Sequence, residues 1–310
     1  MVFLSIVVPC FNEEESVELF FSEIQKTLSN LDFEIIFVDD GSRDNTLAEI
    51  KSIAAGNPNV SYLSFSRNFG KEAAIYAGLN NASGDMVCIM DADLQHPPAL
   101  LPEMICALDD NDVDVAAARR VSRKSDTFFK TLGSRLFYPF FNRISNVELV
   151  DGATDYRVMR RPVVDSILRL EEYNRFSKGL FQWVGFNTRW IDFENIERAQ
   201  GETTWSFGDL VRYSIEAIVA FTTLPLTLSI FLGGLFSVFS FVYIILIVVK
   251  YLLFSDPVQG FTTIMVSMLF LGGVILLSIG ILGKYIEKMY LEIKNRPIYI
   301  VKESDMDDFK

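Results

Sequence analysis

Apolar and polar residues are arranged along the first 120 residues in a pattern that predicts strands and helices in turn. Short apolar runs that end in Pro or acidic residues predict strands, and apolar residues spaced three or four apart predict helices. We expect strands at Phe3–Val8, Glu34–Val38, Val60–Phe65, Met86–Met90 and Val113–Ala118. We expect helices at Glu14–Leu28, Asp44–Ala54, Lys71–Asn80 and Pro98–Leu108. This alternation indicates an α/β fold with a mostly parallel sheet that is covered by helices on both faces.

The pattern is less regular from residue 124 to residue 215. It predicts a strand over Asp151–Arg157 and helices over Pro162–Leu170 and Asn174–Phe186. Phe207–Phe221 combines mixed charge with a strong apolar face, which predicts an amphipathic helix at a membrane surface. We therefore expect one cytoplasmic domain over residues 1–206 and a juxtamembrane helix over residues 207–225.

Two apolar segments follow, and each is long enough to cross a bilayer. Leu226–Val249 and Pro257–Gly283 contain no charged residue, and both exceed the roughly 20 residues that a spanning helix needs. The linker Lys250–Asp256 is short, so the two helices form a hairpin. Basic residues follow the second span, which by the positive-inside rule places the N-terminal domain and the tail, residues 284–310, in the cytoplasm. The acidic tail is expected to be frayed.

Composition narrows the class of protein further. The chain has 28 Lys and Arg residues against 40 Asp and Glu residues, a formal net charge of −12. This balance argues against nucleic acid as a partner, because nucleic-acid-binding proteins carry a basic footprint. The three cysteines, Cys10, Cys88 and Cys106, lie in apolar settings, which indicates buried thiols in a reducing compartment.

The sharpest chemical signal is Asp91-Ala92-Asp93 at the end of a predicted strand. Residues two apart in a strand point the same way, and two adjacent carboxylates repel each other unless a cation lies between them. Oxygen ligands suit Mg²⁺ or Mn²⁺, and Gln95 could add a carbonyl oxygen. We expect a metal site here.

Other strand ends carry polar residues that would meet at the same edge of the sheet. Asp39 and Asp40 end the second strand and suit either a ribose or base contact or a turn, and both roles can coexist. Lys71 follows the third strand with Arg67 and Gly70, and Arg119 ends the fifth. These cations suit a diphosphate, although a solvated loop is the simpler alternative.

Four stretches together resemble the motifs of the polyisoprenyl-phosphate branch of family 2 glycosyltransferases, which includes bactoprenol glucosyltransferases and dolichyl-phosphate mannose synthases. The resemblance spans about Ser5–Tyr213 and extends to the two C-terminal spans. The stretches are Val7-Val8-Pro9-Cys10-Phe11-Asn12-Glu13-Glu14, Val38-Asp39-Asp40-Gly41-Ser42, Ser66-Arg67-Asn68-Phe69-Gly70-Lys71-Glu72 and Asp91-Ala92-Asp93-Leu94-Gln95-His96-Pro97-Pro98.

The resemblance implies a glycosyltransferase A-type, Rossmann-like domain followed by interfacial helices and a two-helix transmembrane hairpin. It implies a UDP-sugar donor, undecaprenyl or another polyprenyl phosphate as acceptor, and a divalent metal at Asp91, Asp93 and Gln95. It also suggests a homotetramer in the cell membrane, with a small membrane flippase as a candidate partner. It places Asp39 near the base or ribose. With the strand-end residues described above, the residues that we expect to bind the nucleotide-sugar are Pro9, Asn12, Glu14, Asp39, Asp40, Lys71, Asp91 and Arg119.

On the acceptor side, Thr154-Asp155-Tyr156-Arg157 resembles a Gly-Asp-Phe-Arg stretch whose Asp is proposed as the catalytic base in this branch. That assigns catalytic roles to Asp155 and Arg157 beside Asp93, with Asp151 as a competitor. A phosphate acceptor with a second pKa near ~6 hardly needs a strong base, so Asp155 could instead orient Arg157 or form a structural ion pair.

Basic residues near the predicted membrane surface are the candidates for the lipid phosphate. They are Arg175, Lys178 and Arg198, and snorkelling at the interface is the alternative role for each. His96 more plausibly shapes its loop than acts as a base.

We therefore expect a membrane-anchored inverting transferase of glucose or N-acetylglucosamine. One alternative is a processive polysaccharide synthase, for which Arg189-Trp190 lacks a Gln at the motif spacing, since Gln182 lies seven residues before Arg189. The other alternative is a catalytically idle membrane scaffold that binds nucleotide-sugar.

Overall fold

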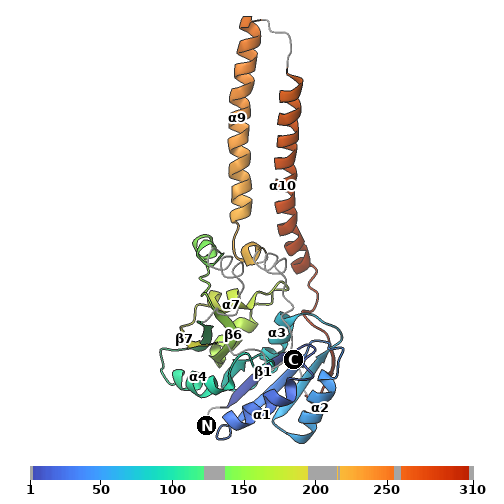
Figure 1. Cartoon of the computed structure of the whole chain (residues 1–310), viewed down its shortest axis with the longest axis vertical. Helices are drawn as coiled ribbons and strands as arrows, with labels where there is room; N and C mark the ends of the chain where they lie inside the picture. Colours follow the sequence, from blue (N-terminus) through green and yellow to red (C-terminus); the bar gives the residue numbers. More distant parts are fainter. Residues whose placement is uncertain (1–2, 122–136, 195–214, 216, 255–259, 307–310) are drawn as a thin grey trace.

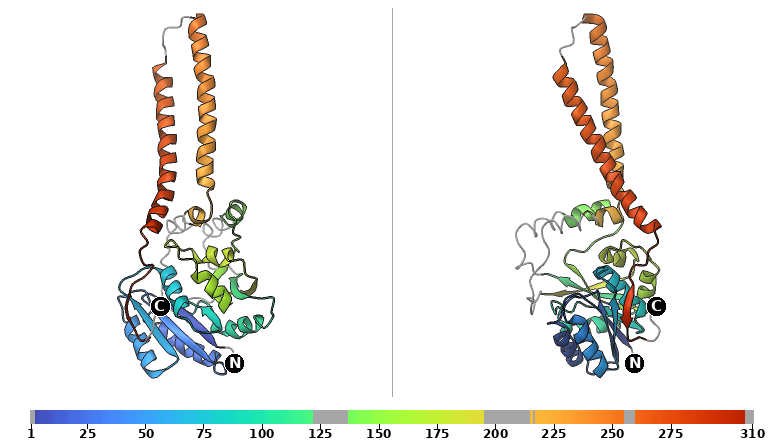
Figure 2. Two further views of the ribbon diagram at one scale, coloured as in Figure 1. Left: turned by 180° about the vertical axis from the view of Figure 1, so that it is seen from behind. Right: turned by 90° about the vertical axis from the view of Figure 1, so that its right-hand side faces the viewer.

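The computed structural model describes residues 3–121, 137–194, 215, 217–254 and 260–306, and every structural statement below concerns these residues. They form an α/β domain from which a long helical hairpin projects (Figure 1). The two helices of the hairpin run side by side in every view (Figure 2).

The domain is built on one eight-stranded sheet. Its order is β7-β5-β6-β4-β1-β2-β3-β8. Strand β1 pairs in parallel with β2 and with β4, and the pairs β2–β3 and β5–β7 are also parallel. Strand β6 is antiparallel to its neighbours β4 and β5, and β8 is antiparallel to β3. The strands are β1 (Leu4–Cys10), β2 (Phe33–Asp39), β3 (Val60–Phe65), β4 (Met86–Ile89), β5 (Val115–Arg120), β6 (Ala153–Arg160), β7 (Thr188–Phe193) and β8 (Val301–Ser304).

Helices cover both faces of this sheet, as the apolar pattern predicts. Alternate residues of β1 divide between two buried clusters, with Ile6 and Val8 in one and Val7 in the other. The contact between α3 and β1 is especially close, since a Cβ at Gly78 would lie 2.1 Å from the Val7 side chain. The helices of the domain are α1 (Val17–Thr27), α2 (Thr46–Gly56), α3 (Lys71–Asn81), η1 (Pro98–Leu100), α4 (Leu101–Ala107), α6 (Arg161–Leu168) and α7 (Ser177–Trp183).

The C-terminal tail differs from the expectation. It is not frayed where it is described, because β8 pairs antiparallel with β3 at the edge of the sheet. Lys51 forms an ion pair with Glu303, and Asp305 accepts a hydrogen bond from the backbone of Tyr62 at 2.7 Å. The prediction of fraying rested on the acidic composition of the tail. The described part of the tail is ordered because β3 offers it a strand edge that is otherwise unpaired among the described strands and Lys51 offers a charge opposite to that of Glu303.

Strand β7 was also missed. The sequence around it reads as the end of a helix followed by an irregular stretch, but it pairs in parallel with β5 over Val115–Arg120. The antiparallel pairs of β6 and β8 make the sheet more mixed than the alternation predicted.

The hairpin consists of α9 (Leu224–Phe254) and α10 (Phe261–Ile293), both long and apolar enough to cross a membrane. Their apolar side chains are exposed, with Ile230 at 75% and Leu276 at 70%, so these helices are not the buried core of a soluble domain. Helix α10 continues ten residues beyond Gly283, where the predicted span ends, and reaches the domain. Residues 207–214 and 216 of the predicted juxtamembrane helix, residues 207–225, lie outside the described residues.

Candidate active site

The loops that follow β1, β3 and β4 enclose a cavity of about 390 Å³ at the carboxyl edge of the sheet. Ligands of open α/β sheets bind at this edge. Five residues that the sequence assigned to the nucleotide-sugar or the metal line the cavity, namely Pro9, Asp40, Lys71, Asp91 and Asp93. Phe11, Glu13 and Asn68 line it as well, and they were overlooked although they lie in the same motifs.

Lys71 connects the two acidic motifs of the site. Its Nζ lies 2.6 Å from Oδ1 of Asp91, after β4, and 2.9 Å from Oδ2 of Asp155, in β6. Sequence analysis predicted a diphosphate contact for Lys71 and did not predict that it bridges the two carboxylates. Asp91 and Asp155 are 64 positions apart, so only the fold brings them to one ammonium group.

The ion pairs shift the pKa values of both kinds of group. Burial alone would lower the pKa of Lys71, but the carboxylates of Asp155 and Asp91 outweigh it and raise that pKa. Burial would likewise raise the pKa of Asp155, yet the charges of Lys71, Lys178 and Arg157 hold it well below its usual value. Asp155 is therefore ionised at neutral pH and is a weak proton acceptor there.

Asp39 and Asp40 end β2 and are both buried. Asp39 accepts hydrogen bonds from the Ser42 backbone at 3.0 Å and the Ser64 hydroxyl at 2.8 Å. Asp40 accepts two from the backbone of Phe69 and Gly70, at 2.6 and 2.8 Å, so it holds the loop that carries Lys71. Both carboxylates thus have a structural role, and Asp40 in addition faces the cavity.

Asn12 and Glu14 hold the β1 loop against the loop after β2. Asn12 accepts a hydrogen bond from the backbone of Arg43 at 2.9 Å, and Glu14 accepts one from that of Asn45 at 2.9 Å. Asn12 also adopts a positive φ of 55°, a conformation that Asn tolerates better than most residues. These two predicted ligand residues shape one wall of the site, and neither lines the cavity itself.

The residues after β4 suit a divalent cation. Asp91 and Asp93 supply hard oxygen ligands, and the ammonium of Lys71 already shows that Asp91 attracts a cation. His96 lies nearby, with Nδ1 3.8 Å from Oδ2 of Asp91, and this buried nitrogen has no hydrogen-bond partner among the described residues. Burial lowers the pKa of His96 and keeps the imidazole neutral.

The described His, Cys, Asp and Glu residues nevertheless form no group of three that could hold a metal ion. A bound ion would need further oxygen atoms, from Gln95 or from a phosphate ligand. That is how Mg²⁺ is commonly held, by one or two carboxylates together with substrate phosphates.

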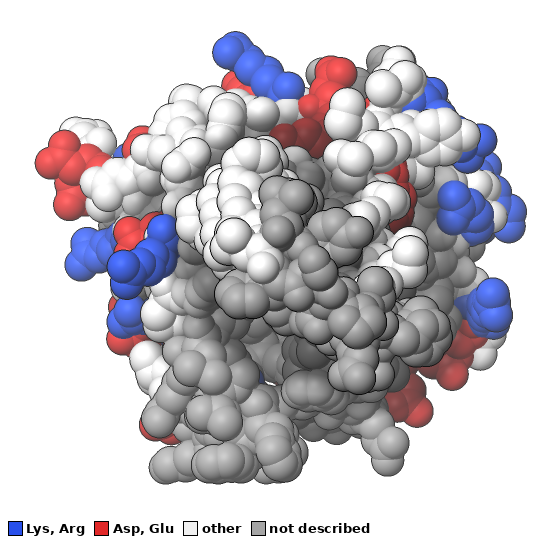
Figure 3. All heavy atoms as spheres, turned by 90° about the horizontal axis from the view of Figure 1, so that it is seen from above, with Lys and Arg blue, Asp and Glu red and all other residues white. Residues whose placement is uncertain are grey.

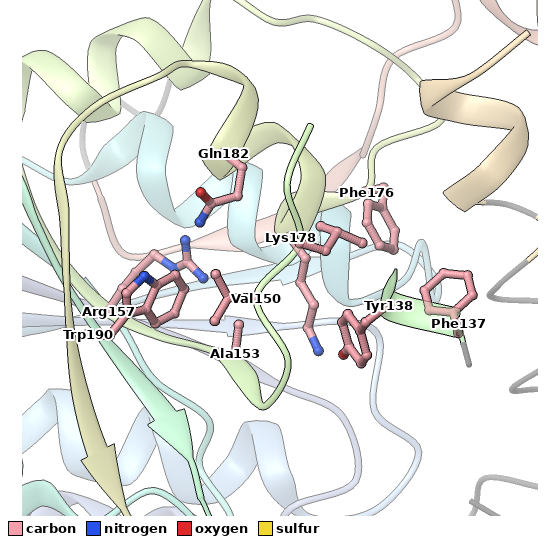
Figure 4. Close-up of a pocket in the computed structure, with 10 residues that line it drawn as sticks. Phe137, Tyr138, Val150, Ala153, Arg157, Phe176, Lys178, Gln182 and Trp190 are labelled. Carbon is pink, nitrogen blue, oxygen red and sulfur yellow. The ribbon is translucent and has the colours of Figure 1, made fainter. Parts of the chain in front are cut away.

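A small second cavity of about 20 Å³ lies beside Asp155 and combines aromatic and basic side chains. Figure 4 shows Arg157, Gln182 and Trp190 at one end, Phe137, Tyr138 and Phe176 at the other, and Lys178 between them. Arg157 is 2% exposed, and its guanidinium lies 3.6 Å from the centre of the Phe181 ring. Burial lowers the pKa of Arg157 to about 10, so it remains a cation at neutral pH.

Glu72 ties α3 to α7 across the site, a contact that the sequence did not reveal. Its carboxylate accepts hydrogen bonds from the backbone and the hydroxyl of Ser177, the residue before Lys178. Glu72 follows Lys71 directly, so the N-terminal end of α3 positions Lys71 and, through Ser177, also Lys178 in the second cavity. Burial raises the pKa of Glu72.

Comparison with known proteins identifies the family of the chain. The family model described as glycosyl transferase family 2 matches residues 5–168. The chain belongs to glycosyltransferase family 2. It is 45% identical over 305 residues to the glycosyltransferase CsbB of Bacillus subtilis, covering 98% of this chain and 92% of that protein. It is 40% identical over 303 residues to a prophage-derived bactoprenol glucosyl transferase of Shigella flexneri, covering 97% and 98%.

The domain of this family 2 glycosyltransferase therefore has the A-type fold that the resemblance implied. The other basic residues that were predicted to contact phosphates do not line a common cavity in the described part of the chain. Arg119 forms a two-pronged ion pair with Asp192 in β7, at 2.6 and 2.9 Å. Lys178 lines the second cavity, Arg175 lines a third at the base of the hairpin, and Arg198 lies outside the described residues.

Proposed function

We propose that this enzyme transfers a single sugar, glucose or N-acetylglucosamine, from a UDP-sugar to a polyprenyl phosphate. One observation carries the proposal. The ammonium of Lys71 joins Asp91 in the donor cavity to Asp155 beside the basic second cavity. The proposed donor site and the proposed phosphate-accepting site would thus adjoin each other, in the domain from which an apolar hairpin projects (Figure 1).

On the donor side, Asp91 and Asp93 would hold Mg²⁺ or Mn²⁺ together with Gln95 and the diphosphate of the UDP-sugar. The ion would stabilise negative charge on the leaving diphosphate. Lys71, with a raised pKa, remains a cation at this place throughout the neutral range. Pro9, Glu13 and Asn68 would bound the space for the nucleoside.

On the acceptor side, Lys178 and Arg157 supply positive charge among aromatic rings. A phosphate bound there would lie next to Asp155, whose charge is balanced by Lys71 and Arg157. The phosphate oxygen attacks the anomeric carbon, and the bond from that carbon to the diphosphate oxygen breaks. UDP leaves with the electron pair of that bond, and attack from the face opposite UDP inverts the configuration at the anomeric carbon.

No proton has to be removed from the acceptor for this step. A phosphate monoester has a second pKa near ~6 and is largely dianionic at neutral pH. We therefore assign Asp155 to positioning Lys71 and Arg157, in place of the role of catalytic base. The ion pair and the low pKa of Asp155 support this assignment.

The apolar helices α9 and α10 are consistent with association with a membrane, where a polyprenyl phosphate resides. We propose that both cross the cell membrane and leave the domain on the cytoplasmic side, since Lys284, Lys288 and Lys294 follow the second apolar segment. Placing the site at headgroup depth would raise the local concentration of a scarce acceptor.

A membrane assay with undecaprenyl phosphate, Mg²⁺ or Mn²⁺, and a panel of radiolabelled UDP-sugars tests the proposal. We expect a labelled lipid from one sugar, lost in Asp93→Asn and retained in Asp109→Asn, which changes an exposed residue after α4. If folded protein that binds UDP and metal gives no labelled lipid from any sugar, transfer to a lipid is excluded.

A further inference from the structure

A third cavity, also about 390 Å³, lies where the base of α10 meets the catalytic domain. The α10 wall carries Lys284 and Lys288, one helical turn apart, and the domain contributes Glu72 and Arg175. Viewed from the hairpin end, charged side chains of both signs lie mostly around the periphery, and side chains of other residues lie nearer the centre (Figure 3).

Three cations, Lys284, Lys288 and Arg175, line the cavity with two carboxylates, Glu72 and Glu287, and Glu292 adjoins it by accepting hydrogen bonds from Asn174. Glu287 pairs with Lys284 at 2.9 Å, and the carboxylate of Glu72 is engaged by Ser177. Lys288 donates to the neutral amide of Asn174 at 2.9 Å and forms no ion pair with a described residue.

Arg175 is the cation on the domain side of the cavity, where burial lowers its pKa and the nearby carboxylates of Glu72 and Glu172 oppose that shift. Its guanidinium lies 4.4 Å from the centre of the Tyr76 ring and donates to the backbone carbonyl of Leu170. Its buried Nε has no hydrogen-bond partner in the described part of the chain. A buried donor without a partner is costly, so an anionic ligand with several acceptor oxygens would satisfy it.

This cavity is separate from the donor cavity, and it meets the second cavity only at Phe176, which lines both. Phe69, Glu72 and Ala73 line it, whereas Gly70, Lys71 and Ala74 line the donor cavity, so the beginning of α3 stands between the two. A phosphate held at Lys288 would therefore lie on the other side of α3 from a sugar in the donor cavity.

The position of the cavity indicates a lipid as that ligand. Leu291 in its wall and Phe176 opposite are apolar, and exposed side chains such as Leu276 and Ile279 continue up α10. We propose that this cavity binds the phosphate of an anionic lipid, whose acyl or isoprenoid chain lies along α10 and which is not the lipid that reacts. The bound headgroup would connect α10 to Arg175. Because Arg175 interacts electrostatically with Glu72, it would also connect α10 to the N-terminal end of α3.

Retention of lipid by the full-length protein tests this without any activity assay. The protein would be purified in neutral detergent and offered phosphatidylglycerol, undecaprenyl phosphate or phosphatidylcholine in turn, and bound lipid would be counted by native mass spectrometry. The test variant is Lys284→Gln with Lys288→Gln. The matched control is Lys294→Gln with Lys302→Gln, which removes the same charge near the same end of the chain.

We expect the wild type and the control to retain an anionic lipid, and the test variant to bind it about tenfold more weakly. Retention of phosphatidylglycerol would identify a bilayer phospholipid as the source of the phosphate. Retention of undecaprenyl phosphate in addition to the copy used in turnover would identify a second acceptor molecule. Equal retention by all three proteins, or equal retention of phosphatidylcholine, would overturn the proposal. Circular dichroism of each variant checks that it is folded.

Discussion

Lys71 Nζ lies 2.6 Å from Asp91 and 2.9 Å from Asp155, so one ammonium group joins the loop after β4 to the beginning of β6. The same carboxylate of Asp91 is the proposed ligand of a divalent metal. Lysine and metal therefore compete for Asp91, and occupancy by one raises the free energy of binding the other.

Replacement of Lys71 by Met should tighten metal binding in the absence of donor. A unit charge a few ångströms away is worth about 1 kcal/mol even in water, so the Kd for Mn²⁺ should fall by roughly tenfold. Electron paramagnetic resonance of free Mn²⁺ measures this directly. The matched control is Lys26→Met, since Lys26 is exposed on α1 and pairs with Glu23. An unchanged Kd in Lys71→Met would show that the lysine and the ion do not share Asp91.

The rate of transfer should fall as the pH drops below about 6, because the acceptor phosphate takes up a proton there. Asp155 should not contribute to this decline, since its pKa is held well below its usual value and it stays ionised. Asp155→Asn should therefore lower the rate while leaving the midpoint of the pH profile in place. Initial rates between pH 5 and pH 8 are the measurement, and loss of the acidic limb in Asp155→Asn would restore the role of base.

Glu72→Ala should weaken the acceptor side selectively. The change removes the acceptor of two Ser177 hydrogen bonds and should cost about 1–3 kcal/mol of stability. Because Ser177 precedes Lys178, the KM for polyprenyl phosphate should rise several-fold while the KM for the UDP-sugar stays the same. Glu72→Gln keeps one acceptor oxygen and should recover most of the loss. Equal increases in both KM values would indicate general damage to the domain.

Tyr299 connects the tail to the sheet and should be important for stability. Its ring stacks on Phe65, with centroids 5.0 Å apart, and meets Tyr76 edge-on at 6.4 Å. Tyr299→Ala should remove about 2 kcal/mol and lower the midpoint of thermal unfolding by roughly 4–8 °C. Tyr290→Ala, on the exposed side of α10, is the control. Equal shifts in the two variants would contradict a structural role for the tail.

The parts of the fold that the sequence predicts are those in which local pattern and tertiary structure agree. Strand β1 and helix α1 form in segments whose apolar spacing predicted them, and apolar residues of both, such as Val8 and Phe20, are fully buried. Strands β7 and β8 are edge strands, and their formation depends on partners far away in sequence. Nothing near Val301 indicates that β3 has an open edge to receive it.

The candidate site shows the same division. Asp91 and Asp93 were predicted to lie at the site because they follow a strand, and the ends of parallel strands meet at one edge of a sheet. Both residues line the donor cavity. The pairing of Lys71 with Asp155 depends on the antiparallel contact between β4 and β6, which periodicity does not specify. The separation of Arg175 from Lys178 likewise depends on the Glu72–Ser177 contact.

Strand β8 also imposes an order on biosynthesis. Among the described strands it leaves the ribosome last, and α9 and α10 precede it along the chain. Domains generally fold from the N-terminus during synthesis, so the edge of β3 stays unpaired while both apolar helices are made. The sheet can therefore be completed only after both helices of the hairpin have been translated. A ribosome that stalls within α10 would release a nascent enzyme whose sheet is still open.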